Sequence, residues 1–144
     1  MNPTKARTNY AFVVADGEEI NKRELVGINY TDGYLYPWAD DAELIFAGVA
    51  DQTLAEGDNI ETVAVDISGP ILARQSVTSA TSIACVGASV YASDETTFDL
   101  NATSNTLPVG IVVRYHGTED CDVLLQTLKE YKDLVLMYSL LGPQ

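Results

Sequence analysis

The chain has 144 residues, 47% of them hydrophobic, and a formal net charge of −13 from 21 acidic and 8 basic residues. This length fits a single domain whose core needs neither disulfides nor metals. The acidic balance argues against nucleic acid as a partner, because phosphate binding needs clustered Lys and Arg. No apolar run approaches the ~20 residues of a membrane-spanning helix, so we expect no membrane partner either.

The N-terminal residues 1–8 are polar and contain Pro3, Lys5 and Arg7. We expect an extended arm that a partner orders, followed by a first strand at residues 9–15. The first ten residues lack the apolar segment of a secretory signal. We therefore expect synthesis in the cytoplasm.

Residues 24–38 (ELVGINYTDGYLYPW) predict a hairpin. Asp32-Gly33 is a preferred pair for a two-residue turn, because both central positions need positive φ. Pro37 should end the second strand, since it cannot donate to a ladder. The next strand, residues 43–50, is apolar on both faces, which predicts cover by its own core and by another subunit. Gly48 within it indicates a bulge or a close backbone approach.

Short strands with period-two patterning continue to residue 127. They are expected at 59–67, at 86–100 as a hairpin, at 109–116 and at 121–127, with a loop or one helical turn over 76–85. In the strand at 109–116 we expect Val109, Ile111, Val113 and Tyr115 to point inward. Residues 128–141 fit helical spacing, although LVLMY could equally be a strand.

These elements predict an all-β fold, a mostly antiparallel small barrel or sandwich. The fold would carry an extended N-terminal arm and a short C-terminal helix. The expected organisation is an arm and first strand at 1–19, a β-rich domain at 20–127 and a helix or tail at 128–144. The tail would pack on the domain or on a neighbour.

Residues suited to catalysis or metal binding are sparse. His116 is the only histidine, and no glycine-rich phosphate loop is present. Cys85 and Cys121 match neither CxxC nor a zinc spacing, and buried free thiols are favoured over a disulfide. We therefore expect no enzyme activity, no cofactor and no metal site.

Four aromatic residues crowd around the predicted hairpin: Tyr30, Tyr34, Tyr36 and Trp38. Such a cluster can form a platform that binds a sugar or a protein neighbour. It can equally supply core residues, because strands commonly carry aromatic side chains for packing. The sequence leaves both readings open.

Several short motifs follow one another in a characteristic order: Asp32-Gly33-Tyr34, Phe46-Ala47-Gly48-Val49-Ala50, Val86-Gly87 with Val90-Tyr91-Ala92-Ser93-Asp94, and Gly110-Ile111-Val112. Across about residues 20–127, this order and spacing resembles the small capsid cement, or head decoration, proteins of tailed bacteriophages and prophages. The first 19 residues and the tail after Thr127 lie outside the resemblance.

The resemblance implies a non-enzymatic protein on the outer capsid surface of the virion. Such proteins bind the major capsid protein of an assembled head and commonly form homotrimers at three-fold and quasi-three-fold positions. They stabilise the contacts between capsomers. The alternative is a β-sandwich module that binds carbohydrate or attaches the virion to its host.

Two sets of contact residues follow from these expectations. The basic residues near the N-terminus could lie along an acidic capsid face, and apolar side chains could join subunits. We expect capsid contacts at Lys5, Arg7, Tyr10, Lys22 and Arg23. We expect subunit contacts at Leu44, Phe46, Val49, Tyr34, Tyr36, Trp38, Tyr138 and Leu141.

Overall fold

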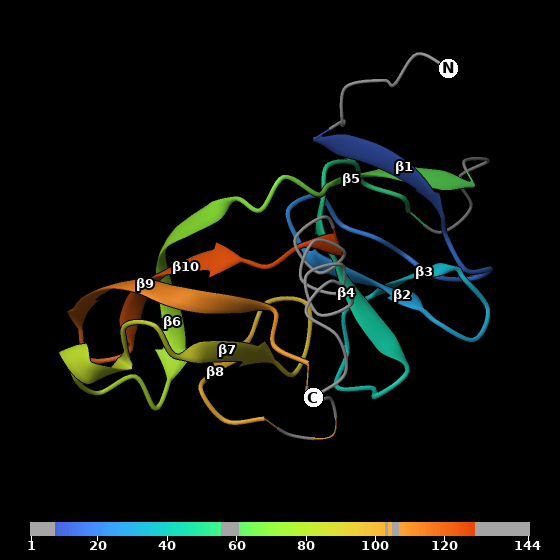
Figure 1. The fold of residues 1–144 in the computed structure, drawn as a ribbon. Coiled ribbons are helices and arrows are strands. Elements are labelled where there is room, and N and C mark those ends of the chain that lie inside the picture. Colours follow the sequence, from blue (N-terminus) through green and yellow to red (C-terminus); the bar gives the residue numbers. More distant parts are fainter. Residues whose placement is uncertain (1–7, 56–60, 103, 105–106, 129–144) are drawn as a thin grey trace, which may run out of the picture.

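The computed structural model describes residues 8–55, 61–102, 104 and 107–128, which form a nearly all-β protein (Figure 1). The predicted all-β class is therefore confirmed. Its ten strands divide into a five-stranded sheet and a closed five-stranded barrel. Residues 1–7 of the arm expected over 1–8, and the expected helix beyond Leu128, lie outside the described residues.

The first half of the chain forms the sheet, here called the sheet unit (residues 8–67). Its strands lie in the order β1-β5-β4-β2-β3, and every neighbouring pair is antiparallel. Just after β1, Val14 forms a parallel bridge to Leu35 in β3, which draws the two ends of the sheet together. The strands are β1 Asn9–Val13, β2 Leu25–Asn29, β3 Leu35–Pro37, β4 Leu44–Ala50 and β5 Thr62–Asp66.

The second half forms the barrel unit (residues 70–127), in the order β10-β6-β8-β7-β9. The β6–β8 pair is parallel and the other pairs are antiparallel. The predicted hairpin over 86–100 is confirmed as β7 and β8, and the short helical turn is η1. The elements are β6 Ile71–Thr78, η1 Ile83–Cys85, β7 Ser89–Ala92, β8 Phe98–Asp99, β9 Gly110–Gly117 and β10 Asp120–Leu125.

The β2–β3 hairpin is confirmed, but its predicted two-residue turn is wrong. Asn29 donates its N–H to Tyr34 O (3.1 Å), so residues 30–33 form a four-residue loop. Gly33 has a φ of +80°, whereas Asp32 does not share the positive φ that a two-residue turn requires. Asp32 instead closes the loop through its side chain, because Oδ1 accepts the Tyr34 N–H (2.8 Å).

Strand β4 contains the bulge expected at Gly48. The β2 residues Val26 and Gly27 pair with Gly48 and Phe46, so Ala47 is the extra residue between them. A Cβ on Gly48 would lie 2.1 Å from Asp66 O in β5. Both the bulge and the close backbone approach are therefore present.

Strand β9 departs from strict period-two alternation. Val123 in β10 pairs with Val112, while Asp122 pairs with Arg114, so Val113 is left between the two pairs. Val112 is fully buried and Val113 is 39% exposed. The prediction that Val113 points inward is wrong, because a bulge shifts the side-chain alternation by one residue.

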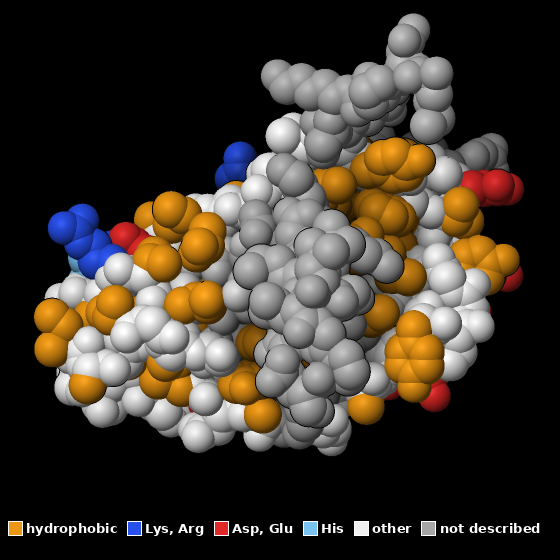
Figure 2. Space-filling model, in the orientation of Figure 1, with side chains coloured by type: hydrophobic (Ala, Val, Ile, Leu, Met, Phe, Trp, Pro, Cys, Tyr) orange, Lys and Arg blue, Asp and Glu red, His pale blue; other side chains and the backbone are white. Residues whose placement is uncertain are grey.

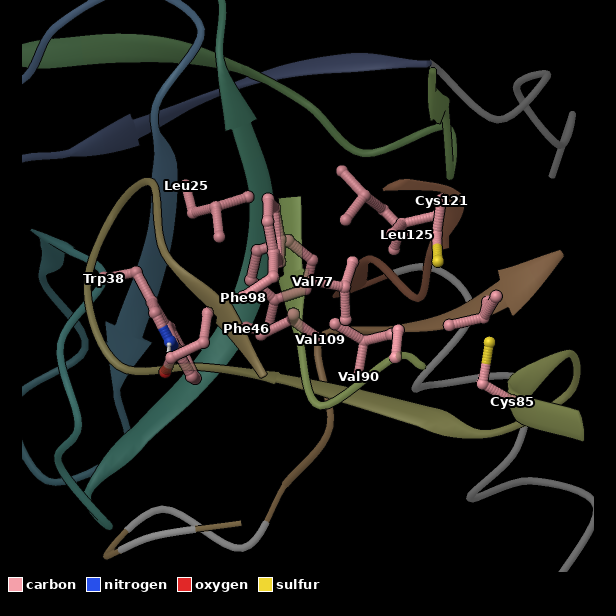
Figure 3. Packing of buried hydrophobic residues seen from close by; sticks show 14 of the residues in the cluster. Leu25, Trp38, Phe46, Val77, Cys85, Val90, Phe98, Val109, Cys121 and Leu125 are labelled. Carbon is pink, nitrogen blue, oxygen red and sulfur yellow. Dashed lines mark hydrogen bonds between the residues drawn. The ribbon is translucent and has the colours of Figure 1, made fainter. Parts of the chain in front are cut away.

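Two packed clusters make up the core. The first, here called the sheet core, contains only residues of the sheet unit: Val14, Ile20, Val26, Leu35, Ala47, Ala50, Leu54, Val63 and Val65. The second, here called the shared core, joins residues of both units: Leu25, Trp38, Leu44, Phe46, Val77, Ala80, Cys85, Val90, Ala92, Phe98, Val109, Val112, Cys121, Val123 and Leu125 (Figure 3).

Trp38 links the two units most directly. Its ring meets Phe46 edge-on, with ring centroids 5.6 Å apart. Its Nε1–H donates to the β7 carbonyl of Ala92 (2.7 Å), which satisfies the polar end of a side chain that is only 1% exposed. A second hydrogen bond also joins the units: the buried Thr127 hydroxyl, after β10, donates to Ile67 O, just after β5 (2.6 Å).

Candidate interaction surfaces

Exposed apolar side chains occur on both units, and Figure 2 shows hydrophobic side chains spread over the visible face of each. Large hydrophobic side chains are normally buried, so exposed groups of them mark candidate contact surfaces. On the sheet unit they are Tyr10, Val13, Tyr30 and Tyr34; on the barrel unit they are Ile71, Ile83, Val86 and Val113.

Strand β1 carries two of these side chains, here called the β1 pair (Tyr10 and Val13). In the described residues, β1 has a strand partner on one side only, namely β5. Tyr10 is 51% exposed, and its ring lies against Phe12 with centroids 5.4 Å apart. An edge strand with exposed apolar side chains can receive a strand or an apolar surface from another chain.

The β2–β3 loop presents Tyr30 and Tyr34, here called the loop tyrosines. Tyr30 is 63% exposed and Tyr34 is 46% exposed. Tyr36 is turned back instead, and its hydroxyl donates to Asp32 Oδ2 (2.6 Å). This hydrogen bond is the main reason that the pKa of Tyr36 is raised to about 12. Tyr36 thus stabilises its own loop, while the loop tyrosines face outward.

The barrel unit presents a group around η1, here called the η1 group (Ile83, Val86 and Val113). Ser82 caps the turn by accepting the Ala84 N–H, and the Ile83 side chain lies at the surface. Gly87 N–H donates to Val112 O (2.8 Å), so the end of η1 is tied to β9 beside the Val113 bulge.

The predicted basic contacts at Lys22 and Arg23 are exposed and have a fixed backbone. Arg23 N–H donates to Ala50 O (2.7 Å), and Lys22 N–H donates to the Thr53 hydroxyl (3.1 Å). Their side chains therefore project from a defined loop just before β2. Lys5 and Arg7, the other basic residues predicted to contact the capsid, lie outside the described residues.

His116 has a structural partner. Its Nε2 lies 2.8 Å from Asp122 Oδ1, and the same oxygen accepts the Arg74 N–H (2.9 Å). The Arg74 N–H and His116 together hold the pKa of Asp122 below its usual range. These contacts join Arg74 in β6, His116 in β9 and Asp122 in β10 on the outside of the barrel.

Neither a metal cluster nor a membrane helix is found in the part of the chain that the structure describes. Over those residues, no three or more His, Cys, Asp or Glu side chains gather as metal ligands. Over the same residues, no helix has the length and apolar character needed to span a bilayer.

Three of the predicted subunit contacts require correction. Leu44, Phe46 and Trp38 are only 1–3% exposed in the single chain, so they offer no surface to a second subunit. The second apolar face of β4, expected to meet another protomer, is covered by the chain's own barrel. The aromatic cluster is accordingly divided between core and surface.

The other predicted subunit contacts have different environments. Tyr34 is exposed, whereas Val49 and Tyr36 are half-buried against the shared core. Tyr138 and Leu141 lie outside the described residues.

Sequence reasoning did not select Val13, Ile71 or the η1 group as surface residues. The exposure of Ile83 and Val86 could have been predicted from their neighbours. Ile83 lies in the hydroxyl-rich segment 76–85, and Val86 lies just after it. No such signal existed for Val113, because its exposure comes from the β9 bulge.

No protein-family model matches the chain, and no curated protein matches it. The motif resemblance therefore remains a prediction.

Proposed function

We propose that this protein is a structural capsid decoration, or cement, protein of a tailed phage. It binds the major capsid protein on the outside of the assembled head and stabilises the contacts between capsomers. It acts as a homotrimer at three-fold and quasi-three-fold positions and has no enzymatic role.

The observation that carries the proposal is the presence of exposed apolar side chains on both units. The β1 pair and the loop tyrosines lie on the sheet unit, while the η1 group lies on the barrel unit. A protein that braces neighbours needs at least two contact surfaces, and apolar side chains contribute most of the energy at such surfaces. The two units share one core, so both surfaces belong to one packed molecule.

The motifs behind the resemblance coincide with positions where the fold is most restrictive. A Cβ on Gly48 would lie 2.1 Å from Asp66 O, and one on Gly110 would lie 2.6 Å from Leu124 O. Both glycines belong to the quoted motifs. The quoted motifs therefore include the two glycines at which an added Cβ would come closest to a neighbouring strand.

The net charge of −13 fits the same role. An acidic outer surface keeps particles soluble and makes them repel one another. Many copies that bind only the assembled lattice would stabilise it collectively by mass action.

The carbohydrate-binding alternative now depends on the loop tyrosines alone. Trp38 was the largest side chain expected in an aromatic platform, and it lies in the shared core. Two exposed tyrosines form a smaller platform than the four aromatic residues of the hairpin suggested. Capsid binding uses more of the exposed apolar surface and is therefore favoured.

The direct test is sedimentation of the purified protein with bare, expanded heads of the phage that encodes it. We expect saturable co-sedimentation and a head that resists heat better than the bare head. The double variants Tyr10→Ser/Val13→Ser and Ile83→Ser/Val86→Ser should each weaken binding by about tenfold or more, because each removes two exposed apolar side chains.

Thr118→Ala, in the exposed turn between β9 and β10, is the matched control and should bind like the wild type. Unchanged thermal unfolding of each double variant would show that its fold is intact. Absence of the wild-type protein from the head pellet contradicts the proposal, and glycan binding by the isolated protein would then favour the alternative.

A further inference from the structure

The barrel unit contains two cysteines that come from different elements. Cys85 ends η1 and is 8% exposed, whereas Cys121 in β10 is fully buried; both are free thiols. Both side chains belong to the shared core. Their sulfur atoms point into the space between η1 and β10 (Figure 3).

The backbone explains why these cysteines meet. After η1, Gly87 N–H donates to Val112 O (2.8 Å), and Val112 N–H donates to Ala88 O (3.0 Å). Val112 pairs across the ladder with Val123 in β10. Cys121 precedes Val123 by two residues and is buried like it, so its side chain lies on the same inward face.

The titration of Cys121 is consistent with this proximity. The pKa of its thiol is raised to about 11, mainly by burial, and the charge and hydrogen bonding of the Cys85 thiol contribute to the same shift. Because the thiolate is the reactive form, little of Cys121 is reactive at neutral pH. Reaction at this pair therefore begins at the more accessible Cys85.

We propose that Cys85 and Cys121 are a disulfide-forming pair whose oxidant is a small-molecule disulfide of the glutathione type. Cys85 Sγ attacks the oxidant, forms a mixed disulfide and releases one glutathione thiol. Cys121 Sγ then attacks Cys85 Sγ and releases the second glutathione thiol. The two protein thiols lose two electrons to the oxidant, and their two protons end on the two glutathione thiols.

The resulting bond encloses β7, β8 and β9 in one covalent loop. A cross-link over such a loop stabilises the fold, mainly by restricting the unfolded chain. Reducing surroundings keep the pair as thiols, whereas oxidising surroundings allow it to close. The barrel thus gains stability when the protein leaves a reducing compartment.

The test uses the full chain with excess glutathione disulfide at about pH 7 and about pH 9. Intact mass should fall by two hydrogen atoms, and peptide mapping should join Cys85 to Cys121. Closure should be faster at the higher pH, because more Cys121 is then thiolate. Thermal unfolding should shift upward by about 10 °C and return to its first value after reduction with dithiothreitol.

Cys85→Ser and Cys121→Ala are the matched variants, and neither should show the reversible upward shift. The wild-type mass measurement stands on its own if a variant fails to fold. A lasting glutathione adduct, a bond between two chains, or thiols still unreacted at about pH 9 overturns the proposal. A closed bond that leaves thermal unfolding unchanged overturns the stabilising role.

Discussion

The two units differ in how each completes its core. Every buried member of the sheet core comes from the sheet unit itself. The shared core contains four buried residues of the sheet unit, Leu25, Trp38, Leu44 and Phe46, among those of the barrel unit. The sheet can close its own core, whereas the barrel is completed by side chains that the sheet supplies. The barrel should therefore depend on the sheet more than the sheet depends on the barrel.

The units also differ in backbone regularity. Arg74, Ser79 and Glu119 have positive φ in the barrel unit, against Arg23 alone among non-glycine residues of the described sheet unit. Register shifts occur once between β6 and β10 and twice between β9 and β10, against one between β2 and β4 in the sheet unit. Closing a small barrel requires sharp bends, and bulges and left-handed residues provide them.

The largest expected effect comes from Trp38→Ala, which should lower the free energy of unfolding by about 3–5 kcal/mol. The change leaves a cavity in the shared core, removes the edge-on contact with Phe46 and leaves Ala92 O without its donor. Denaturant unfolding measures the loss. Hydrogen exchange should rise more in β7 than in β5, because β7 loses its bond to the sheet unit.

Val26→Ala is the matched change in the sheet core and should raise exchange mainly in the sheet unit. If both variants raise exchange equally in both units, the barrel does not depend on the sheet in the way described.

A smaller loss is expected for Gly48→Ala, about 2–3 kcal/mol, because the added Cβ would meet Asp66 O and force β4 away from β5. Gly117→Ala is the control, since a Cβ there has no neighbour within 4 Å. Thermal unfolding of the two variants makes the comparison. Equal stability of the two would show that the approach of β4 to β5 is not restrictive.

The smallest effect is expected for Asp94→Ala, in the turn between β7 and β8. Asp94 Oδ1 accepts the N–H groups of Thr96 (2.9 Å) and Thr97 (2.8 Å), so its loss should cost about 1 kcal/mol at neutral pH. The hydrogen bond from the Thr96 N–H is the main reason that the pKa of Asp94 is lowered.

Because the folded pKa lies below the unfolded one, this stabilisation is present above the unfolded pKa of about 3.9 and fades as pH falls through the folded pKa. Urea unfolding should therefore show the gap between variant and wild type shrinking below about pH 4. Asp16→Ala, at an exposed turn, is the control. A gap that stays constant with pH would remove the carboxylate from the explanation.

Local chemistry in the sequence was sufficient to predict the strands other than β6, the β2–β3 and β7–β8 hairpins, the Gly48 bulge and the buried thiols. The last residues of β6 lie where a loop or helical turn was predicted over 76–85. Alternating apolar residues and glycine positions act over a few neighbouring residues, and so they can be read directly from the chain. The patterning also predicted a strand at 121–127, where Cys121, Val123, Leu125 and Thr127 alternate and are all buried.

Only the tertiary structure decided which apolar side chains remain at the surface. The sequence shows that Leu44 and Phe46 need cover, but the barrel that covers them lies far along the chain. Val113 is exposed because two bonded strands differ by one residue in register, and a single strand carries no record of its partner's register. The meeting of Cys85 and Cys121 likewise depends on the β9–β10 ladder, since burial and contact are properties of the packed chain.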